Sequence, residues 1–424
     1  MRAALAAFFS SARLASALAT TSIGVGILAW SLDNVIGFGG VVGILLAQLG
    51  LCAASAWARR DSIETIGILP ISLLAFLVWS IVSLAWSQYQ WVTLGSLVYL
   101  GAFTALGLYV AAVRDTLQVI RSFGDVLRFV LVVSIVLEVF SGILIDAPIR
   151  FLGIDAHLAT GGPISGVLGN RNELGLLAVI GCISFAIEWR MRSIERQLAI
   201  GSLALAVITL VLTRSPIAWG TALVAAGVLG TLYLIRRLAP ERRRFWQFAV
   251  LAAAAVAAVT AWLLRSFIVG SLNADGDLNY RLRLWQELWA QLWLHPVEGW
   301  GWIGQWNTEV PPYLSFGLGT ERESASAVNA YLDVWFQLGF IGLTIFVGML
   351  GLAFVRSWLL AAHRRSVQFT WPAVVLAALL TASLAESGIL IEFGWMTFVI
   401  CCTLASQNLS WRNALRKPLE QEPL

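Results

Sequence analysis

Apolar stretches long enough to cross a bilayer recur along the whole of this sequence. A helix needs roughly 17–25 residues to span the hydrocarbon core of a membrane. The chain has 424 residues, of which 59% are hydrophobic and only 12% charged, and its mean hydropathy is +0.80. A soluble core does not absorb that composition, so we predict an all-α polytopic membrane protein, one integral membrane domain over residues 1–424. The twelve predicted spans cover residues 14–32, 35–57, 66–87, 92–113, 129–147, 173–189, 197–213, 216–235, 245–264, 327–355, 369–386 and 389–408.

The basic residues test this count, because Lys and Arg are retained on the cytoplasmic side of a membrane. With a cytoplasmic N-terminus, 21 of the 28 basic residues fall in cytoplasmic segments. The alternation between Arg-rich and Arg-poor gaps would collapse if one span were missed. We therefore predict an even number of spans with both termini cytoplasmic. The seven basic residues left on the outer side are Arg150, Arg171, Arg214, Arg265, Arg281, Arg283 and Arg322.

Charge and cysteine usage exclude several classes of partner. The net charge of +4 is the retained cytoplasmic charge, and no basic patch is interleaved with aromatic residues, so nucleic acid is not an expected partner. All four cysteines fall in apolar spans without CxxC or Cys/His spacing, so we expect neither disulfides nor a metal site. No cofactor is expected. The cysteines are Cys52, Cys182, Cys401 and Cys402.

Two connections on the predicted outer side are long, residues 148–172 and 265–326. Loops longer than roughly 12–15 residues in a compact protein are usually functional or disordered. The second contains RLRLWQELWAQLWLHP (281–296), whose apolar residues recur at helical spacing. A tryptophan-rich amphipathic helix is typical of a membrane surface, so residues 265–326 are predicted to form a lid or platform in contact with membrane lipids. The apolar face is predicted to consist of Leu282, Trp285, Leu288, Trp289, Leu292 and Trp293.

Outer-side arginines next to membrane ends are unusual, because this is the side that is normally poor in positive charge. The planar guanidinium donates two parallel hydrogen bonds and stays protonated, which suits a lipid-linked pyrophosphate. An alternative stays open: the arginines reach lipid headgroups or pair with acidic residues of the long loop. The arginines concerned are Arg171, Arg214, Arg265, Arg281 and Arg283, and the acidic residues are Asp275, Asp277 and Glu287.

Other ionisable and polar residues can be interpreted either as functional or as structural groups. Glu138 lies inside the fifth predicted span, and Glu386 and Glu392 flank the last turn. A buried ionisable group in a membrane is a candidate functional residue, although a structural hydrogen bond between helices explains each equally well. His157, in the first long loop, is a candidate base, and Asn170 is expected to cap the sixth span.

Several motifs together resemble one family. GNRNELG opens a helix, RLRLWQELWAQLWLHPVEGWG lies in a long late loop, and SAVNAYLDVWFQLGFIGL follows. With the span count, this pattern is similar to the O-antigen ligase and polysaccharide polymerase superfamily, by motif over about residues 160–350. The most specific part is Arg-x-x-x-Trp followed by His-Pro-x-x-Gly-x-Gly. It is met by Arg281, Trp285, His295, Pro296, Gly299 and Gly301.

The resemblance implies an activity and a location. Members of that superfamily are metal-independent glycosyltransferases that move a glycan from a polyprenyl-pyrophosphate carrier to an acceptor hydroxyl on the extracytoplasmic face. It implies a multi-pass protein of the bacterial inner (cytoplasmic) membrane, with a glycan or a lipid as acceptor. By similarity, Arg281 would bind the donor pyrophosphate with help from Arg171. Arg214 and Arg283 are further candidates for that role.

The sequence departs from the family pattern at two places. A His-Asn pair is expected before the tenth helix, the His deprotonating the acceptor, but the chain has Val328 and Asn329. The turn before the eighth span often reads Ser-Arg, but here Pro216 follows Ser215. Valine takes no proton, and loss of a general base typically costs about 10²–10⁴ in rate.

The start of the tenth span carries polar residues four apart. Asn329, Asp333 and Gln337 therefore share one helix face, which we predict to line a polar cavity. The candidate catalytic positions are Val328, Asn329 and Asp333. If the chain is active, Glu323, Asp333 or His157 is expected to replace the missing histidine.

Two other functions remain open. The departures at Val328 and Pro216 also fit a non-catalytic binding protein or scaffold of a polysaccharide assembly system. A transporter of lipid-linked sugars is the third possibility, and it rests on Glu138 alone, since no matched pair of interrupted spans is found.

Overall fold

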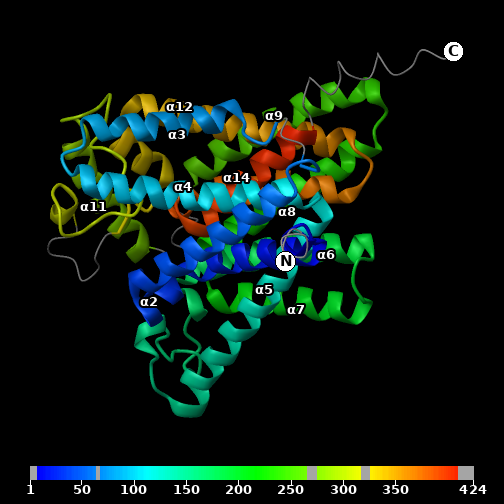
Figure 1. Cartoon of the computed structure of the whole chain (residues 1–424), viewed down its shortest axis with the longest axis horizontal. Coiled ribbons are helices and arrows are strands. Elements are labelled where there is room, and N and C mark those ends of the chain that lie inside the picture. Colours follow the sequence, from blue (N-terminus) through cyan, green and yellow to red (C-terminus); the bar gives the residue numbers. More distant parts are fainter. Residues whose placement is uncertain (1–6, 64–66, 265–274, 317–324, 409–424) are drawn as a thin grey trace.

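The computed structural model describes residues 7–63, 67–264, 275–316 and 325–408, and its secondary structure is helical (Figure 1). Within these residues, extended pairing is limited to a single bridge between Ile149 and Ile154. Each of the twelve predicted spans contains a helix or an arm of one. The α-helices are α2 (Ala12–Ala58), α3 (Ile71–Val82), α4 (Gln90–Val113), α5 (Thr116–Val139), α6 (Arg171–Met191), α7 (Arg196–Thr213), α8 (Pro216–Arg237), α9 (Pro240–Leu263), α11 (Asp275–Leu292), α12 (Ala330–His363), α13 (Trp371–Ala382) and α14 (Glu392–Asn408).

Helix α2 folds back on itself at Gly37 and so provides the first two predicted spans. The backbone of Gly37 has φ +74°, a conformation that glycine adopts without a Cβ penalty. The side chain of Gln48 donates to the carbonyl of Leu18 at 2.9 Å, and Ser55 donates to the carbonyl of Phe9 at 3.1 Å. These contacts pair the end of one arm with the beginning of the other, so the two arms run antiparallel.

Seven helices of the described residues are long and apolar enough to cross a membrane by length and composition. They include α2, which the Gly37 turn divides into two arms, and α12, which is kinked at Gly339. The shorter apolar helices cover Ile71–Ala85 and Val367–Ala382. The helical, membrane-type fold is thus confirmed, and the number of twelve spans stays a prediction.

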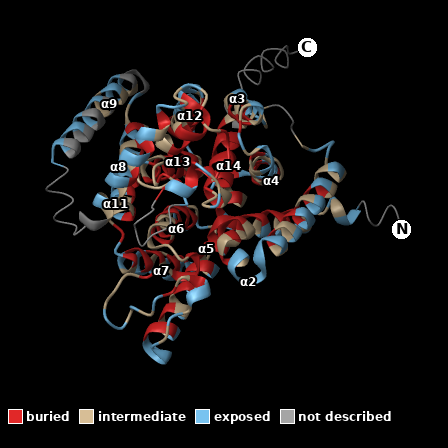
Figure 2. Ribbon diagram, turned by 90° about the vertical axis from the view of Figure 1, so that its left-hand side faces the viewer, coloured by how far each residue is buried: buried red, intermediate tan, exposed pale blue. Residues whose placement is uncertain are grey.

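The core lies where α6, α13 and α14 meet, which Figure 2 shows as the most continuously buried part of the bundle. Residues 371–379 of α13 are all buried. Helices at the rim are apolar on their outer faces as well, as on α7 and α8, where Val207 and Leu223 are exposed. A helix that is apolar all round is expected in a membrane, because its outer face meets lipid.

Hydrogen bonds between the segments that connect the helices agree with the side of the membrane predicted for each segment from its arginines. Arg59 donates to the carbonyl of Ser10 at 3.0 Å, and Arg121 donates to the carbonyl of Ser193 at 3.0 Å. All four residues belong to segments predicted to be cytoplasmic. The connections predicted to lie outside likewise contact one another at the opposite end of the bundle, called the α11 end below. Which end faces the cytoplasm stays a prediction.

Glu138 ties the first long loop to the end of α5. Its Oε1 accepts the backbone N–H groups of Ser165 and Gly166, each at 2.8 Å. The side chain is buried, and both of its hydrogen-bond partners are backbone amides of the loop. The contact gives Glu138 a structural role, although its partners lie in a loop and not in another helix as the structural alternative expected. The transporter hypothesis rested on this residue alone.

Candidate active site

One face of α11 contacts three other elements through side chains four residues apart. Asp277 pairs with Arg171 at the start of α6, and Arg281 donates to Glu386 Oε1 at 3.1 Å. One turn further on, Trp285 Nε1 donates to the carbonyl of Ala327 at 2.9 Å. Residues at this spacing lie one above the other on a helix. Helix α11 is therefore held across the end of the bundle by this polar and aromatic stripe.

The apolar face predicted for this helix is only partly right. The buried residues are Leu284, Leu288 and Leu292, at a spacing of four. Leu282, Trp289 and Trp293 are exposed, and Trp285 is half-buried. Leu288 and Leu292 were predicted on the face toward the membrane surface, but the structure buries them with Leu284 against the rest of the protein. The tryptophans left outside fit the predicted position at a membrane surface.

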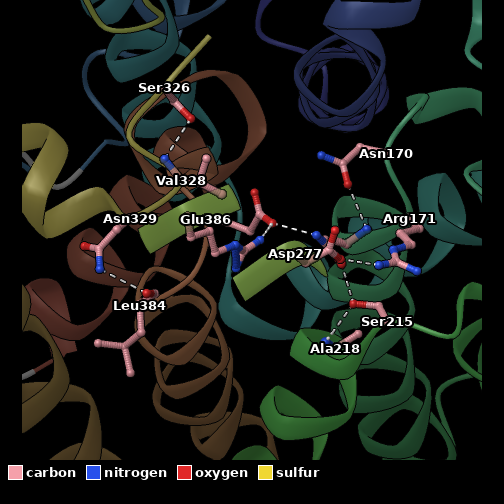
Figure 3. A network of polar contacts seen from close by, with 12 residues as sticks. Asn170, Arg171, Ser215, Ala218, Asp277, Ser326, Val328, Asn329, Leu384 and Glu386 are labelled. Carbon is pink, nitrogen blue, oxygen red and sulfur yellow. Dashed lines mark hydrogen bonds and ion pairs between the residues drawn. The ribbon is translucent and has the colours of Figure 1, made fainter. Parts of the chain in front are cut away.

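Glu386 is the centre of a chain of hydrogen bonds at this end. Its Oε1 accepts from Arg281 and, at 2.6 Å, from Asn172 Nδ2. The Oδ1 of Asn172 in turn accepts from Ser215 Oγ at 2.6 Å, and Ser215 caps α8 by accepting from Ala218 N (Figure 3). Four elements thus meet here: α6, the start of α8, α11 and the loop after α13. We call Arg171, Asn172, Asp277, Arg281 and Glu386 the arginine–carboxylate cluster.

The loop that carries Glu386 was predicted to be the end of a span. Helix α13 ends at Ala382, and residues 383–391 form a connection with one short 3₁₀ turn. Burial raises the pKa of the Glu386 carboxyl above its usual value, and the nearby Arg281 guanidinium together with the Asn172 amide opposes that rise. A carboxyl with a raised pKa takes up a proton more readily than an ordinary one.

Arg171 lies in the first turn of α6, next to the predicted cap. Asn170 Oδ1 accepts from Asn172 N at 2.8 Å, so the predicted capping role of Asn170 is confirmed (Figure 3). The side chain of Arg171 is 33% exposed, whereas that of Arg281 is 12% exposed. Arg281 Nε is buried without a hydrogen-bond partner among the described residues. Arg281, the more buried of the two arginines, therefore has an N–H group that can still donate to a ligand.

Position 328 has an unusual backbone. Val328 has φ +50°, the left-handed region, which costs a β-branched residue roughly 1–2 kcal/mol. Next to it, Asn329 caps α12 by accepting from Tyr331 N and Leu332 N, and its Nδ2 donates to the carbonyl of Leu384 at 3.0 Å. These contacts, with the bond from Ala330 N to the carbonyl of Ser383, hold residues 329 and 330 against the loop that carries Glu386 (Figure 3). The position of the expected histidine is next to them in the chain.

Asp333 and Gln337 face a protein loop instead of the predicted polar cavity. Asp333 Oδ1 accepts from Trp306 Nε1 at 2.7 Å and from Gln337 Nε2 at 2.8 Å, and both acidic and amide side chains are fully buried. Gln337 Oε1 accepts from the backbone N–H groups of Ile303 and Gly304 at 2.8 and 2.9 Å. We call Asp333, Gln337, Trp306 and this stretch of loop the buried clamp.

Two glycines allow the loop to approach α12 closely: Gly299 of the His-Pro-x-x-Gly-x-Gly stretch and Gly339 of α12. A Cβ on Gly299, at φ +74°, would lie 2.5 Å from the backbone of Gln337. A Cβ on Gly339, at φ +68°, would lie 1.9 Å from the carbonyl oxygen of Val297. The loop and α12 therefore touch backbone to backbone, which explains why glycine is required on both sides.

Two predicted arginines lie apart from the cluster contacts. Arg283 is exposed, two residues from Arg281 and so on a different face of α11. Arg214 is also exposed, at φ +45° in the turn before Ser215, and its guanidinium reaches toward Gly161 of the first long loop. His157 is exposed in that same loop. Their roles stay predictions. Arg265, Arg322 and Glu323 lie outside the described residues.

Sequence reasoning underrated three members of the cluster. Asn172 was interpreted only as part of the cap of the sixth span, Asp277 only as a possible ion-pair partner, and Glu386 as one of two carboxyls at a turn. The available signal was that all three fall on the same predicted side as Arg281. Within the described residues, no group of three or more His, Cys, Asp or Glu side chains is arranged to hold a metal ion.

Comparison with known proteins places this geometry in a family context. Residues 201–347 match the family model described as O-Antigen ligase. The match runs from within α7 to within α12, and it carries Arg281 and the buried clamp but neither Arg171 nor Glu386. Over these residues the match confirms the resemblance to the O-antigen ligase and polymerase superfamily that the motifs indicated. No curated protein matches the chain.

Proposed function

We propose that this protein transfers a glycan from a polyprenyl-pyrophosphate carrier to an acceptor hydroxyl at the α11 end of the bundle. The observation that carries the proposal is the arginine–carboxylate cluster, in which Arg171 and Arg281 approach one site from α6 and α11. The family match supports O-antigen ligase-like glycan transfer in general. The protein would act in the bacterial inner membrane with this end on the extracytoplasmic side and both termini in the cytoplasm.

The two arginines would hold the pyrophosphate of the donor. In the structure each guanidinium is paired with a carboxylate, Arg171 with Asp277 and Arg281 with Glu386. A pyrophosphate offers more acceptor oxygens and more negative charge than one carboxylate, so it competes for the same donors. The Nε of Arg281, which has no hydrogen-bond partner among the described residues, gives this guanidinium a further donor for the ligand.

The chemistry needs a leaving group and a proton acceptor. The acceptor oxygen bonds to the anomeric carbon as the bond from that carbon to the pyrophosphate oxygen breaks, and the pyrophosphate leaves with the electron pair. The arginines stabilise the charge that develops on it. We assign the hydroxyl proton to the carboxylate of Glu386, because Val328 takes none and Glu386 lies in the segment that residues 329 and 330, next to Val328, contact. Its raised pKa suits a general base.

Turnover of a polyprenyl-pyrophosphate-linked glycan by the purified protein tests this function. A base must be deprotonated, so the rate is expected to fall as the pH falls through the raised pKa of Glu386. Glu386→Gln is expected to lower kcat by about 10²–10⁴ and to abolish that acidic limb. A variant that keeps both the rate and the pH profile would rule out Glu386 as the base.

Val328→His in the same assay distinguishes a site that has its own general base from a site that lacks one. If Glu386 serves as base, the added histidine is expected to change the rate by less than about 10²-fold, the lower end of what a general base contributes. Activity that appears only in Val328→His would show that the chain lacks its proton acceptor and would contradict the role given to Glu386.

A non-catalytic binding role is the second candidate, and the paired state of both arginines favours it. A scaffold would bind the polyprenyl-pyrophosphate-linked glycan without turning it over, in the original chain and in Val328→His alike. Binding that depends on Arg281 combined with no turnover in either protein would select this function over catalysis.

A further inference from the structure

A second recess opens at the same end of the bundle, beside the turn of the α2 hairpin. It is a cavity of about 190 Å³ between that turn, α4, the start of α14 and the loop segment 302–305. The volume lies below the roughly 300–1,000 Å³ of most small-molecule sites, so it suits one sugar ring rather than an oligosaccharide. None of the cluster residues lines it.

The walls of this cavity combine aromatic rings with hydrogen-bonding groups. Tyr99, Phe103, Trp302 and Trp395 contribute rings, and Tyr99 donates its hydroxyl to Glu392 Oε1 at 2.9 Å. Further polar groups come from Asp33, Ser96 and Gln305. A sugar ring has apolar C–H faces and a rim of hydroxyls, and it needs both kinds of wall. Carboxylates and amides accept from the hydroxyls, while the rings cover the faces.

One wall residue has a hydrogen-bond donor that nothing in the described part of the chain satisfies. Trp302 is 1% exposed, and its Nε1 is buried without an acceptor. This atom lies next to Gly304: a Cβ on Gly304 would be 3.9 Å from Trp302 Nε1 and 3.7 Å from Ile391, both of which are at the cavity wall. A buried N–H without a partner costs about 1–3 kcal/mol, and an oxygen of a ligand in the cavity would satisfy it.

The cavity and the arginine–carboxylate cluster are joined by two elements. The loop after α13 carries Glu386 in the cluster, and its continuation, Leu390 to Glu392, lines the cavity. Ile303 and Gly304, on another wall, are held by Gln337 of the buried clamp. A ligand in the cavity is therefore held by the same framework that supports the cluster.

We propose that this cavity binds one saccharide unit of the acceptor, through Trp302 Nε1, Glu392 and the surrounding rings. The proposal rests on the glycan transfer proposed above, because it supplies the second substrate of that reaction. It places donor and acceptor on two sides of residues 386–392, with the donor pyrophosphate at Arg281 and the acceptor sugar at Trp302.

Binding of monosaccharides can be measured directly, without any turnover. The full chain is placed in phospholipid nanodiscs free of glycosidic detergent, and saturation-transfer NMR is recorded with methyl glycosides of glucose, galactose, mannose, rhamnose and N-acetylglucosamine. At least one is expected to bind. Trp302→Phe removes the N–H together with one ring of the indole, and it is expected to weaken binding by at least about 5- to 10-fold, the effect of one hydrogen bond. Trp300→Phe is the matched control, because Trp300 Nε1 is likewise buried without a partner but does not line the cavity.

A blocking variant keeps the test decisive if Trp302→Phe fails to fold. Gly95 lines the cavity on α4 and has open space where a Cβ would go, so Gly95→Leu is expected to reduce binding more than tenfold by filling the cavity. Gly101, on the same helix, also has open space but lies outside the cavity, so Gly101→Leu should bind as the original chain does.

Donor binding on the same samples separates the two proposals. No glycoside binding, or binding that Gly95→Leu leaves intact, overturns the acceptor site even if polyprenyl pyrophosphate still binds through Arg281. Glycoside binding that Gly95→Leu removes, with no Arg281-dependent binding of polyprenyl pyrophosphate, overturns the proposed function and with it the assignment of the sugar as acceptor. Both ligands binding, each lost in its own variant, supports both proposals.

Discussion

The arginine–carboxylate cluster and the buried clamp lie at the same end of the bundle, and both use acidic side chains, but in opposite ways. In the clamp, Asp333 is fully buried and its oxygens accept from an indole, an amide and the backbone N–H of Ala327. In the cluster, Glu386 meets the charged Arg281 and remains partly accessible, at 18% side-chain exposure. The acidic group of the clamp accepts from neutral donors, whereas that of the cluster accepts from the charged Arg281 guanidinium and from the Asn172 amide.

The difference teaches how to separate a structural polar group from a reactive one. A buried acceptor whose hydrogen bonds all go to fixed neutral donors rigidifies the protein, and its loss should appear as lost stability. A charge pair at an accessible surface can exchange its partner for a ligand of the same sign, so its loss should appear as lost binding or rate. Substitutions in the two regions are therefore expected to affect different measurements.

The largest effect is expected at the glycine that lets the clamp form. Gly339→Ala would place its Cβ 1.9 Å from the carbonyl oxygen of Val297, at φ +68°, so the loop must move. We expect a loss of about 4–5 kcal/mol in the free energy of unfolding, measured by denaturation in detergent. Gly348→Ala is the control, because the same helix has open space there. Equal stability of the two variants would show that the loop at Val297 can move away from the added Cβ without a measurable loss of stability.

The next effect belongs to the cluster. Arg281→Ala is expected to lower turnover of the lipid-linked glycan about 10²–10³-fold, the effect of one lost donor to a developing charge. Its thermal stability should stay close to that of the original chain, measured in the same detergent. Arg196→Ala, which removes an exposed arginine at the start of α7 and away from the cluster, serves as the control. Unchanged binding of polyprenyl pyrophosphate to Arg281→Ala would contradict the donor site.

Asp333→Ala comes third and should act on stability. Its loss leaves the Trp306 indole, the Gln337 amide and a backbone N–H without their acceptor, which is expected to cost about 3 kcal/mol. Asp125→Ala, at a side chain that is 67% exposed, should change stability by less than about 0.5 kcal/mol. If Asp333→Ala folds normally but loses turnover, Asp333 belongs with the reactive residues and the comparison fails.

The smallest effect is expected at position 328. Val328→Asn places a residue that tolerates the left-handed region at φ +50° and is expected to raise stability by about 0.5–1 kcal/mol. Val328→Ile keeps both the branch and the backbone conformation, so it should show no gain in the same unfolding experiment. A gain in Val328→Ile as well would show that packing, rather than backbone strain, limits this position.

Much of the fold could be predicted because its signals are local. Each predicted span coincides with a helix or helical arm, since a run of apolar residues specifies a membrane helix without reference to distant sequence. The cap at Asn170 and the helix carrying Arg281 were likewise predicted from neighbouring residues. The membrane-facing position predicted for Leu288 and Leu292 was wrong, because both are buried in a cluster whose members outside α11 come from other parts of the sequence.

The candidate site was predicted less completely, for a related reason. Asp333 and Gln337 were expected to line a cavity because helical spacing shows which residues share a face but not what covers that face. The structure covers it with residues 303–306. Glu386 gave no stronger signal than Glu392, because its importance comes from Arg281 and Asn172, which lie 105 and 214 residues away along the chain.

Composition, apolar periodicity and arginine placement were thus enough to establish a helical membrane protein with a long amphipathic connection and unusual arginines, because these properties depend on each segment and its solvent. The pairing of Arg281 with Glu386, the burial of Asp333 and the cavity beside Trp302 required the assembled bundle. An ion pair or a hydrogen bond forms only between groups that lie close together in space. The sequence contains many residues of a suitable type for each group, and it does not show which of them is near. Packing of the helices selects among them.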